Sequence, residues 1–450
     1  MSPTNRWPEM TERNARPMPT DLSRLDATLA RIDGEITTAI EKGLPDGPVR
    51  LGEISQQGWN LLQGDLPMPN LVLKQSALTH NTAHMQAYCD QHGAWFSPHG
   101  KTTMAPKIFR DQLKAGAWAI TVANIAQLQV CLSFGIERVY VANEMVTEYD
   151  ARFLARQLVQ RPSSEIYVAV DSKAGVDVLA AAVKASGTGR RQRVLVDFGM
   201  PGGRCGLRSV EDAVALAHII LAEGSALELV GVHGYEGIAQ GSTREAKLAS
   251  ANAYLHDLQR VARHVAALCP DATPFLVTAG GSEYFDRVVD LLGAKALAGC
   301  QLVLRSGGYV THDSSFYDKI SPFGSRTWRP AQGARLIPAI EVWSAVLSLP
   351  EPGLAILGMG GRDMPTDIEL PVPLFHSRKG RSPAKLDGEW RVTRSNDQHA
   401  YLSYPSGHDL AVGDLIGSGI SHPCTAFDKW RSILVVDEDY RVVDAVRTYF

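Results

Sequence analysis

The sequence predicts an α/β protein in which a (β/α)8 TIM-type barrel is followed by a C-terminal, mostly antiparallel β domain. The first observation is that short apolar segments alternate with helical stretches between about residues 71 and 305. The second is that this alternation stops after about residue 325, where β-rich segments follow one another between glycines and prolines. Strands that alternate with helices form parallel sheets, whereas strands joined directly form antiparallel ones.

Eight apolar segments are the candidate strands of the barrel. They cover residues 94–97, 119–123, 139–142, 166–170, 194–198, 230–234, 275–278 and 302–305. Eight strand–helix units over about 250 residues match the number and size of a closed (β/α)8 barrel. A doubly wound open sheet is the structural alternative, because it shows the same alternation. The number of units favours the barrel.

The change of pattern predicts three parts. Residues 68–325 are assigned to the barrel and residues 326–450 to the β domain. Residues 1–67 form an N-terminal extension, in which residues 21–43 have apolar positions at helical spacing and end at a glycine. We expect this extension to pack on the β domain.

Composition excludes several classes of function. With 45% hydrophobic residues and a net charge of −3, the 450-residue chain has the composition of a soluble enzyme, and nothing favours nucleic acid or an anionic membrane as partner. It has no apolar run of about 18 residues, and its first residues lack the apolar core of a signal peptide. The six cysteines are scattered, which is typical of reduced thiols in a cytoplasmic protein.

A lysine follows the first strand candidate directly, in the segment PHGKTTMAPKI. Catalytic groups of parallel barrels lie at the carboxyl ends of the strands. Desolvation and neighbouring cations lower the pKa of a lysine and free its amine for Schiff-base chemistry. Lys101 is therefore a candidate for covalent catalysis, although an ordinary surface lysine fits the same position.

Two glycine-rich segments, TAGGSEYF and RSGGYVTHD, follow the seventh and eighth strand candidates. Barrel enzymes commonly bind phosphate in these two loops, where glycines let backbone N–H groups approach an anion. The glycines are also compatible with plain turns. The candidate phosphate cradle consists of Gly280, Gly281, Ser282, Gly307, Gly308 and Tyr309.

Further polar residues lie after other strand candidates. Arg204 lies in the glycine-rich segment DFGMPGGRCG, and its guanidinium is suited to a ring nitrogen or a carboxylate. His233 and Tyr235 lie in GVHGYEG after the sixth candidate. Each of the three is equally compatible with a loop or packing role.

The segment SGISHPCTAFDKW contains His422 and Cys424 two positions apart. In an extended strand, residues i and i+2 point to the same face, so the pair can bind one metal ion. Two protein ligands leave positions open for water and substrate, which is typical of catalytic sites. Imidazole and thiolate favour zinc over magnesium or manganese. A strand pair without metal is the alternative.

Taken together, the chain resembles the D-serine dehydratase and D-threonine aldolase family. The segments PHGKTTMAPKI, GRCG, TAGGS, RSGGY and SHPCTAFDKW occur in the family's order, and the resemblance runs from about residue 68 to the C-terminus, some 85% of the chain. It implies a PLP-binding barrel of the alanine racemase type followed by a β domain. It also implies a homodimer, since the β domain of one subunit often closes the site of its partner.

The resemblance assigns roles residue by residue. It implies that Lys101 is the Schiff-base residue, that His422 and Cys424 hold the metal, and that Arg204 contacts the pyridine nitrogen of PLP. Tyr235 and His233 match positions that line the family's site, and we expect His99 to hydrogen-bond the cofactor.

A cysteine as second metal ligand is typical of D-serine dehydratases, which use zinc, whereas D-threonine aldolases have an aspartate there. The resemblance therefore implies a PLP- and metal-dependent dehydratase (zinc or another divalent ion). Its substrate would be D-serine or a related 3-hydroxy-D-amino acid, converted to a 2-oxo acid and ammonia. The alternatives are retro-aldol cleavage of 3-hydroxy-D-amino acids and, in a different class, a non-catalytic PLP-binding protein. The C-terminal domain argues against the last.

Overall fold

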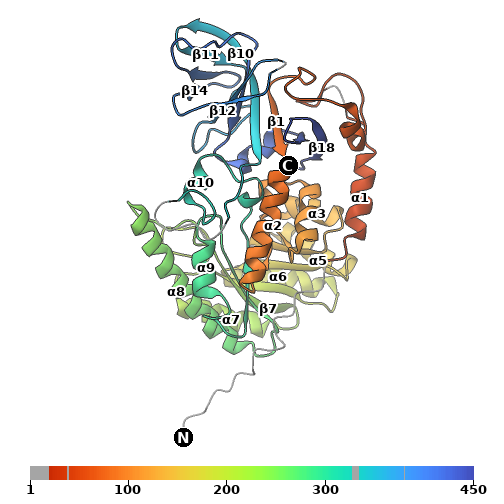
Figure 1. Ribbon diagram of the computed structural model, residues 1–450. Coiled ribbons are helices and arrows are strands. Elements are labelled where there is room, and N and C mark those ends of the chain that lie inside the picture. Colours follow the sequence, from red (N-terminus) through yellow and green to blue (C-terminus); the bar gives the residue numbers. More distant parts are fainter. Residues whose placement is uncertain (1–19, 38–39, 327–333, 380) are drawn as a thin grey trace. The chain divides into compact units, whose positions relative to one another are not determined.

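The computed structural model describes residues 20–37, 40–326, 334–379 and 381–450 (Figure 1). Their contacts define two compact units, which interleave along the chain. The barrel unit comprises residues 20–21, 86–99 and 112–307. The β unit comprises the described residues of 22–85, 100–111 and 308–450. The predicted parts are continuous ranges of the chain, with boundaries after residues 67 and 325, and these boundaries stay predictions.

Eight parallel strands form the sheet of the barrel unit, in the order β2-β9-β8-β7-β6-β5-β4-β3. Each of the eight predicted segments overlaps one of them, so this part of the fold prediction is confirmed. The strands are β2 Trp95–Phe96, β3 Ile120–Val122, β4 Arg138–Glu144, β5 Glu165–Val170, β6 Gln192–Phe198, β7 Leu227–Gly234, β8 Phe275–Ala279 and β9 Cys300–Leu304.

The sheet curls until its first and last strands meet. His99 and Thr121 form a parallel bridge between the chain after β2 and β3. The Thr121 N–H donates to Pro98 O at 2.9 Å, and the hydroxyls of Ser97 and Thr121 lie 2.7 Å apart. The barrel is therefore closed, and the open doubly wound sheet is wrong.

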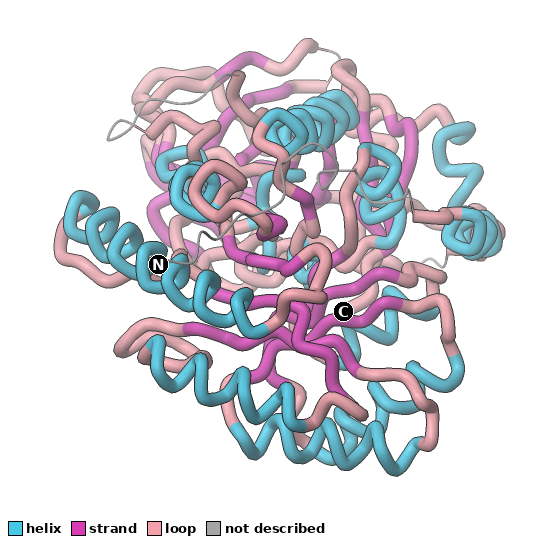
Figure 2. Tube along the Cα trace, turned by 90° about the horizontal axis from the view of Figure 1, so that it is seen from below, coloured by secondary structure: helices cyan, strands magenta, loops and turns pink. Residues whose placement is uncertain are grey.

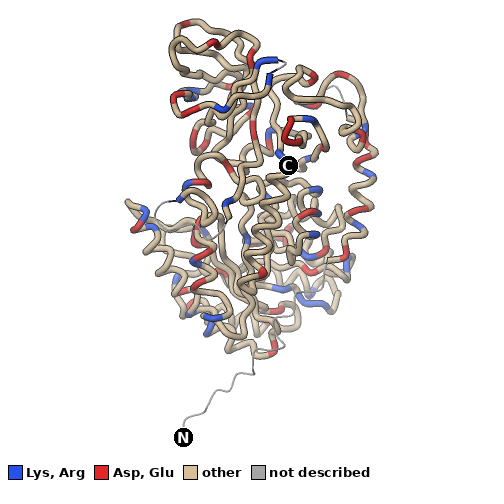
Figure 3. The backbone as a smooth tube through the Cα atoms, in the orientation of Figure 1, with Lys and Arg blue, Asp and Glu red and all other residues tan. Residues whose placement is uncertain are grey.

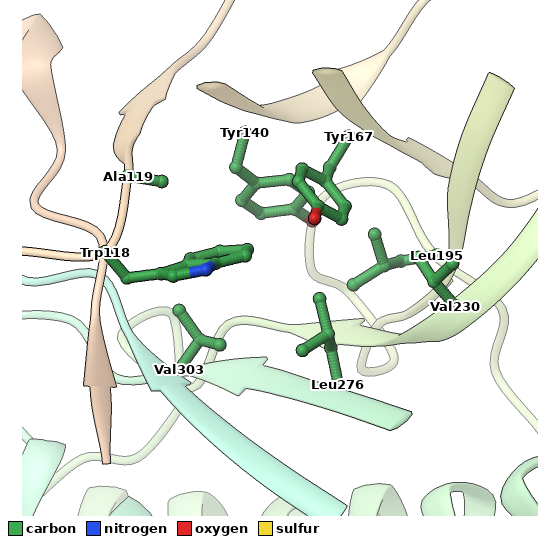
Figure 4. Packing of buried hydrophobic residues seen from close by; sticks show 8 residues of the cluster. All are labelled: Trp118, Ala119, Tyr140, Tyr167, Leu195, Val230, Leu276 and Val303. Carbon is green, nitrogen blue, oxygen red and sulfur yellow. The ribbon is translucent and has the colours of Figure 1, made fainter. Parts of the chain in front are cut away.

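Side chains fill the inside of the barrel (Figure 4). Every strand, or the residues just before it, contributes at least one member to a single buried cluster, which is the packing expected of a closed eight-stranded barrel. The members are Trp118, Ala119, Tyr140, Tyr167, Leu195, Val230, Leu276 and Val303, with Trp95 packed against them.

Helices cover the outer side of the barrel strands (Figure 2). They are α4 Ile125–Ser133, α5 Glu148–Gln160, α6 Lys173–Ser186, α7 Val210–Ala222, α8 Arg244–Leu268 and α9 Phe285–Leu292. Most begin at a side-chain cap, in which an oxygen accepts the N–H three residues on. The capping residues are Asn124, Thr147, Ser172, Ser209 and Thr243. Two further helices, α2 Gln75–Gln91 and α3 Pro106–Ala115, contribute residues to both units.

The β unit is built on a mostly antiparallel sheet, as predicted. Its main path is β13-β12-β16-β10-β1-β17-β18, and β11, β14 and β15 extend it from β10. The strands are β1 Asn70–Lys74, β10 Ile340–Glu351, β11 Leu354–Leu357, β12 Val372–Ser377, β13 Ala384–Lys385, β14 Arg391–Ser395, β15 Ala400–Ser403, β16 Leu415–Gly419, β17 Ser432–Val436 and β18 Val442–Arg447. Although β1 lies inside the range assigned to the barrel, it pairs with β10 and β17.

The N-terminal helix is shorter than predicted. Helix α1 spans Ser23–Asp33, so the prediction is wrong for residues 34–37 and 40–43, while residues 38–39 lie outside the described residues. After Gly34 the backbone is extended and not helical, because Ile36 forms an antiparallel bridge with Arg50. On either side of Ile36, Glu35 and Glu41 both accept hydrogen bonds from Arg447 of β18 at 2.7 Å. These bonds connect the segment after α1 to the sheet of the β unit.

Short helices complete the described chain. They are η1 Leu51–Gln57, η2 Gly100–Thr102, η3 Gly308–Val310, α10 Phe316–Ile320, η4 Pro423–Thr425 and η5 Phe427–Lys429. No helix within the described ranges is long and apolar enough to cross a membrane. Basic and acidic residues alternate along both units, in keeping with a net charge of −3 (Figure 3).

Candidate active site

A buried polar network lies inside the barrel unit. The Tyr140 hydroxyl on β4 and Nδ1 of His233 on β7 are in hydrogen-bond contact. The other ring nitrogen of His233 lies 3.7 Å from Oδ1 of Asp197 on β6. All three side chains are buried. The network therefore joins three barrel strands through polar groups in the interior.

Burial sets the protonation states of this network. Burial, followed by the positive charge of Arg305, lowers the pKa of His233 well below its ordinary value. Burial and a hydrogen bond with Glu144 raise the pKa of Asp197, and burial raises that of Tyr140. His233 is thus neutral near pH 7, so its contact with Asp197 is not an ion pair.

Arg305 brings a buried positive charge to the loop after β9. It is 6% exposed and donates to Thr278 Oγ1 at 2.6 Å and to Gly234 O at 2.7 Å. Both acceptors are neutral oxygens. A buried guanidinium is stabilised by an anion nearby. Arg305 stands in the quoted RSGGY segment, but sequence reasoning did not single it out.

The two predicted glycine loops meet in the structure. Ser306 donates its hydroxyl hydrogen to Gly281 O at 2.9 Å, and the Arg305 N–H donates to Gly280 O at 3.2 Å. Gly280 has φ +95°, and a Cβ there would lie 2.6 Å from Leu304 Cδ2. Only glycine fits this tight turn. The loops therefore form the kind of cradle that an anionic group requires.

Glu236 closes part of this cradle. Its carboxylate is fully buried and accepts the N–H of Gly280 at 3.1 Å and that of Gly281 at 2.7 Å. Two of the amides predicted to face a phosphate are thus hydrogen-bonded to a carboxylate. Sequence reasoning missed Glu236. The only signal was its place between Tyr235 and Gly237.

Arg204 and Tyr235 lie together beside the same loop. The Arg204 guanidinium lies over the Tyr235 ring, 5.0 Å from its centroid. A Cβ at Gly281 would lie 2.7 Å from the same ring, so the ring approaches the loop closely. Burial and the neighbouring Glu236 raise the pKa of Tyr235 to about 12. Ser282, the next residue of the loop, is half-buried.

An acidic cluster adjoins Arg204. The ligand atoms of Glu144, Asp171 and Cys205 lie within 4.8 Å of one another, and the Gly206 N–H donates to Asp171. A hydrogen bond with Glu144 raises the pKa of Cys205 to about 11. The thiol is therefore protonated near pH 7 in the metal-free protein.

Lys101 lies in the short helix η2 of the β unit, and its side chain is exposed. The residues on either side of it are buried, and Gly100 O accepts the N–H of Met104 at 2.8 Å. His99, two residues earlier, is half-buried and makes the bridge that closes the barrel. In the other predicted loop Gly307, Gly308 and Tyr309 are all buried.

The metal pair lies in a turn, not in a strand. Strand β16 ends at Gly419, and Pro423 opens the helix η4 directly after His422. The expected extended geometry is therefore wrong, because proline favours the first position of a helical turn. The turn still brings the side chains together: hydrogen bonding with Cys424 is the largest cause that raises the pKa of His422 to about 9.

Asp367 is a third member of this turn that the sequence did not reveal. Its Oδ2 accepts the Nδ1–H of His422 at 2.5 Å, and its Oδ1 accepts the Thr425 hydroxyl at 2.9 Å. Burial alone would raise the pKa of Asp367, but the hydrogen bonds from His422 and Thr425 hold this pKa below its ordinary value. Because 55 residues separate Asp367 from His422, no local pattern connects them.

The turn also contacts the segment that carries Lys101. Thr102 Oγ1 and Cys424 Sγ lie 3.3 Å apart, in hydrogen-bond contact. Imidazole and thiol are a suitable donor pair for zinc. Within the described ranges, no third histidine, cysteine or carboxylate places a ligand atom close to both. The described residues therefore bring together two donor side chains here, an imidazole and a thiol.

Family models match both parts of the chain. Residues 73–287 match the N-terminal domain of alanine racemase, and residues 339–436 match the putative serine dehydratase domain. The chain thus combines an alanine-racemase-type barrel with a serine dehydratase domain, which confirms the family resemblance and the fold class. No curated protein matches the chain in sequence.

Solved structures share this fold. D-threonine aldolase from Filomicrobium marinum is 23% identical, with a TM-score of 0.72 over 90% of this chain and 98% of its own. D-threo-3-hydroxyaspartate dehydratase from Delftia sp. HT23 is 21% identical, with a TM-score of 0.66 over 87% and 99%. A metal-free cysteine-to-alanine variant of a dehydratase of that name is 20% identical, with a TM-score of 0.67 over 87% and 99%.

Proposed function

We propose that the protein is a PLP- and metal-dependent lyase that converts a 3-hydroxy-D-amino acid to a 2-oxo acid and ammonia. One observation carries the proposal. His422 and Cys424, a pair suited to a catalytic metal, contact the short helix of Lys101 through the 3.3 Å approach of Cys424 to Thr102. The domain combination is that of serine dehydratases joined to an alanine-racemase-type barrel.

The proposal assigns the following residues to the cofactor. Lys101, an exposed residue in η2, attaches PLP through its amine. The glycine loops are assigned to the phosphate; because Glu236 accepts the N–H groups of Gly280 and Gly281, a phosphate bound to these two amides would have to replace that carboxylate. The remaining cofactor contacts in the proposal are His99, Arg204, Tyr235, Gly280, Gly281, Ser282, Gly307, Gly308 and Tyr309.

We propose His422 and Cys424 as the protein ligands of the metal, and zinc as the ion, because a thiolate and an imidazole favour it. A structure of similar fold is of a cysteine variant in a metal-free form, which fits a cysteine ligand in that dehydratase. At this position an aspartate would instead favour a harder ion.

When bound, PLP supplies an electron sink for charge at Cα, and the metal supplies positive charge at the departing β-hydroxyl. The chain supplies the proton transfer. The Lys101 amine would act as the general base that removes the Cα proton of the bound substrate. Loss of the β-hydroxyl as water, followed by addition of one water and release of ammonia, yields the 2-oxo acid.

A substrate panel tests this function. Purified protein loaded with PLP and Zn²⁺ is incubated with D-serine, D-threo-3-hydroxyaspartate and D-threonine, and with the L-enantiomers as controls. We expect 2-oxo acid and ammonia in equal amounts from at least one D-substrate and from no L-enantiomer. Absence of 2-oxo acid from every substrate contradicts the proposal.

Retro-aldol cleavage is the second candidate, because a D-threonine aldolase has the same fold over 90% of this chain. The same residues would then deprotonate the β-hydroxyl, and the Cα–Cβ bond would break. The products separate the two reactions, since cleavage gives an aldehyde and glycine without ammonia. Glycine in place of ammonia would assign the chain to the aldolase branch.

We further propose a homodimer that acts in the cytoplasm on small-molecule D-amino acids. The fold class supports the dimer. The cytoplasm is supported by the cysteines, since all six are free in the structure. Sedimentation velocity of the loaded protein tests the dimer, which a single species at the 48.9 kDa mass of one chain would exclude.

A further inference from the structure

The imidazole of His422 is held by a carboxylate. Its Nδ1–H donates to Asp367 Oδ2 at 2.5 Å. An imidazole can ligate a metal through one nitrogen only when the other carries the proton. Since Nδ1 is engaged by Asp367, Nε2 is the nitrogen available to a metal.

Asp367 also holds the turn that follows His422. Its second oxygen accepts the Thr425 hydroxyl at 2.9 Å, and Thr425 lies directly after Cys424. The two oxygens of the Asp367 carboxylate therefore accept hydrogen bonds from both ends of the segment from His422 to Thr425. The backbone closes the same turn, since the Thr425 N–H donates to His422 O at 3.3 Å, and the carboxylate of Asp367 adds a second connection across it.

We propose that Asp367 is the positioning residue of the metal pair. Its carboxylate selects the Nδ1–H tautomer of His422, sets the plane of the ring and anchors the turn that carries Cys424. Outer carboxylates of this kind typically change metal affinity by about 10- to 100-fold when removed. The inference rests on the proposed function, because it takes His422 and Cys424 as the metal ligands.

A direct ligand role for Asp367 is the competing explanation. In the structure its oxygens contact Nδ1 of His422, and within the described part of the chain no carboxylate oxygen lies close to both His422 and Cys424 as a third ligand. A metal held through Nε2 would lie on the far side of the ring from Asp367. The two roles therefore differ in the size of the loss on removal.

The test measures metal binding and not turnover. PLP-loaded protein is freed of metal and titrated with Zn²⁺ against a chromogenic chelator, and with Co²⁺ to follow the thiolate-to-cobalt absorption band. The variants are Asp367→Ala, Asp367→Asn and His422→Ala. The matched control is Asp397→Asn, since the Asp397 side chain is 84% exposed and its nearest cation, Arg362, lies 3.8 Å away.

We expect Asp367→Ala to weaken Zn²⁺ binding about 10- to 100-fold and to shift the cobalt band. Asp367→Asn should lose less, because its amide oxygen still accepts the Nδ1–H. Asp397→Asn should stay within about twofold, as expected for an exposed ion pair. A retained PLP absorption band and melting temperature show that a weakened variant is folded, and Asp367→Asn tests the role if Asp367→Ala does not fold.

Two results overturn the inference alone: Zn²⁺ binding by Asp367→Ala within about twofold of the parent, or a loss as large as that of His422→Ala, which would make Asp367 a ligand. A parent protein that binds no metal overturns both this inference and the metal role in the proposed function. Metal binding by the parent protein therefore separates the two failures.

Discussion

Two histidines of the molecule have opposite environments. In the barrel unit His233 is 6% exposed, and burial lowers its pKa well below the ordinary value. In the β unit the His422 side chain is 19% exposed, and contact with Cys424 and Asp367 raises its pKa to about 9. One ring is a neutral member of a packed network, and the other is held by polar neighbours at a partly open turn.

The same contrast extends to the groups around the two rings. The barrel network is closed by the fold itself, since Tyr140, Asp197, Arg305 and Glu236 are all buried with partners inside the unit. The turn of His422 has fewer contacts, and the Asp367 side chain is 43% exposed. Changes in the barrel network should therefore act on stability, whereas changes at the turn should act on ligand binding and turnover.

The largest effect is expected at Lys101. Lys101→Ala removes the amine that attaches the cofactor, so the absorption band of lysine-bound PLP should disappear entirely. Because the side chain is exposed, the melting temperature should hardly change. Absorption spectra and thermal unfolding check both points, with Lys114→Ala on α3 as control. A persisting band would assign the attachment to another residue.

Loss of the metal pair should come next. Cys424→Ala, or chelation of the parent, should lower turnover about 100-fold or more, because charge stabilisation by a metal supplies several kcal/mol. The PLP band should remain, since neither change removes Lys101. Product release and the spectrum are measured on the same sample. Full turnover after chelation together with the Cys424→Ala change would rule out a metal role.

In the barrel unit, Glu236→Ala should act on stability. It leaves the Gly280 and Gly281 N–H groups without their acceptor, at about 1–3 kcal/mol for each buried donor. The urea midpoint, followed by tryptophan fluorescence, should fall clearly. Glu236→Gln keeps one acceptor oxygen and should lose about half as much. An unchanged midpoint in Glu236→Ala would show that the loop does not depend on this carboxylate.

The smallest effect is expected at the contact between Lys101's helix and the metal turn. Thr102→Val keeps the shape of the side chain but removes the hydroxyl 3.3 Å from Cys424 Sγ. One hydrogen bond contributes about 1 kcal/mol, so Zn²⁺ affinity should fall about fivefold. Thr103→Val is the control, because Thr103 is equally buried and bonds only to the backbone of Ala105. Equal affinities of the two variants would mean that the contact contributes nothing to the site.

Much of the fold was predictable, because local sequence periodicity determines it. Each of the eight barrel strands overlaps one of the predicted apolar segments, although the strand lengths differ from those of the segments. The sequence did not reveal that β1 pairs in the β unit. An apolar segment of five residues fits either sheet, so its composition does not indicate its strand partner. Nor did the sequence reveal the end of α1 at Asp33, because the bridge from Ile36 to Arg50 is a tertiary contact.

The candidate site was predictable where residues are close in the chain. His422 and Cys424 do meet, though through a proline turn and not through an extended strand. Glu236 and Asp367 were missed because their partners lie 44 to 58 residues away and a single carboxylate has no spacing to detect. Long-range hydrogen bonds therefore mark the limit of what these motifs could predict.

The most direct test of the account is pyruvate release from D-serine by protein loaded with PLP and Zn²⁺, beside a sample treated with EDTA. We predict pyruvate and equimolar ammonia in the metal-loaded sample, almost none after EDTA, and recovery when Zn²⁺ is restored. Equal pyruvate in all three samples would contradict the assignment of His422 and Cys424. No pyruvate from the loaded protein would contradict D-serine as the substrate.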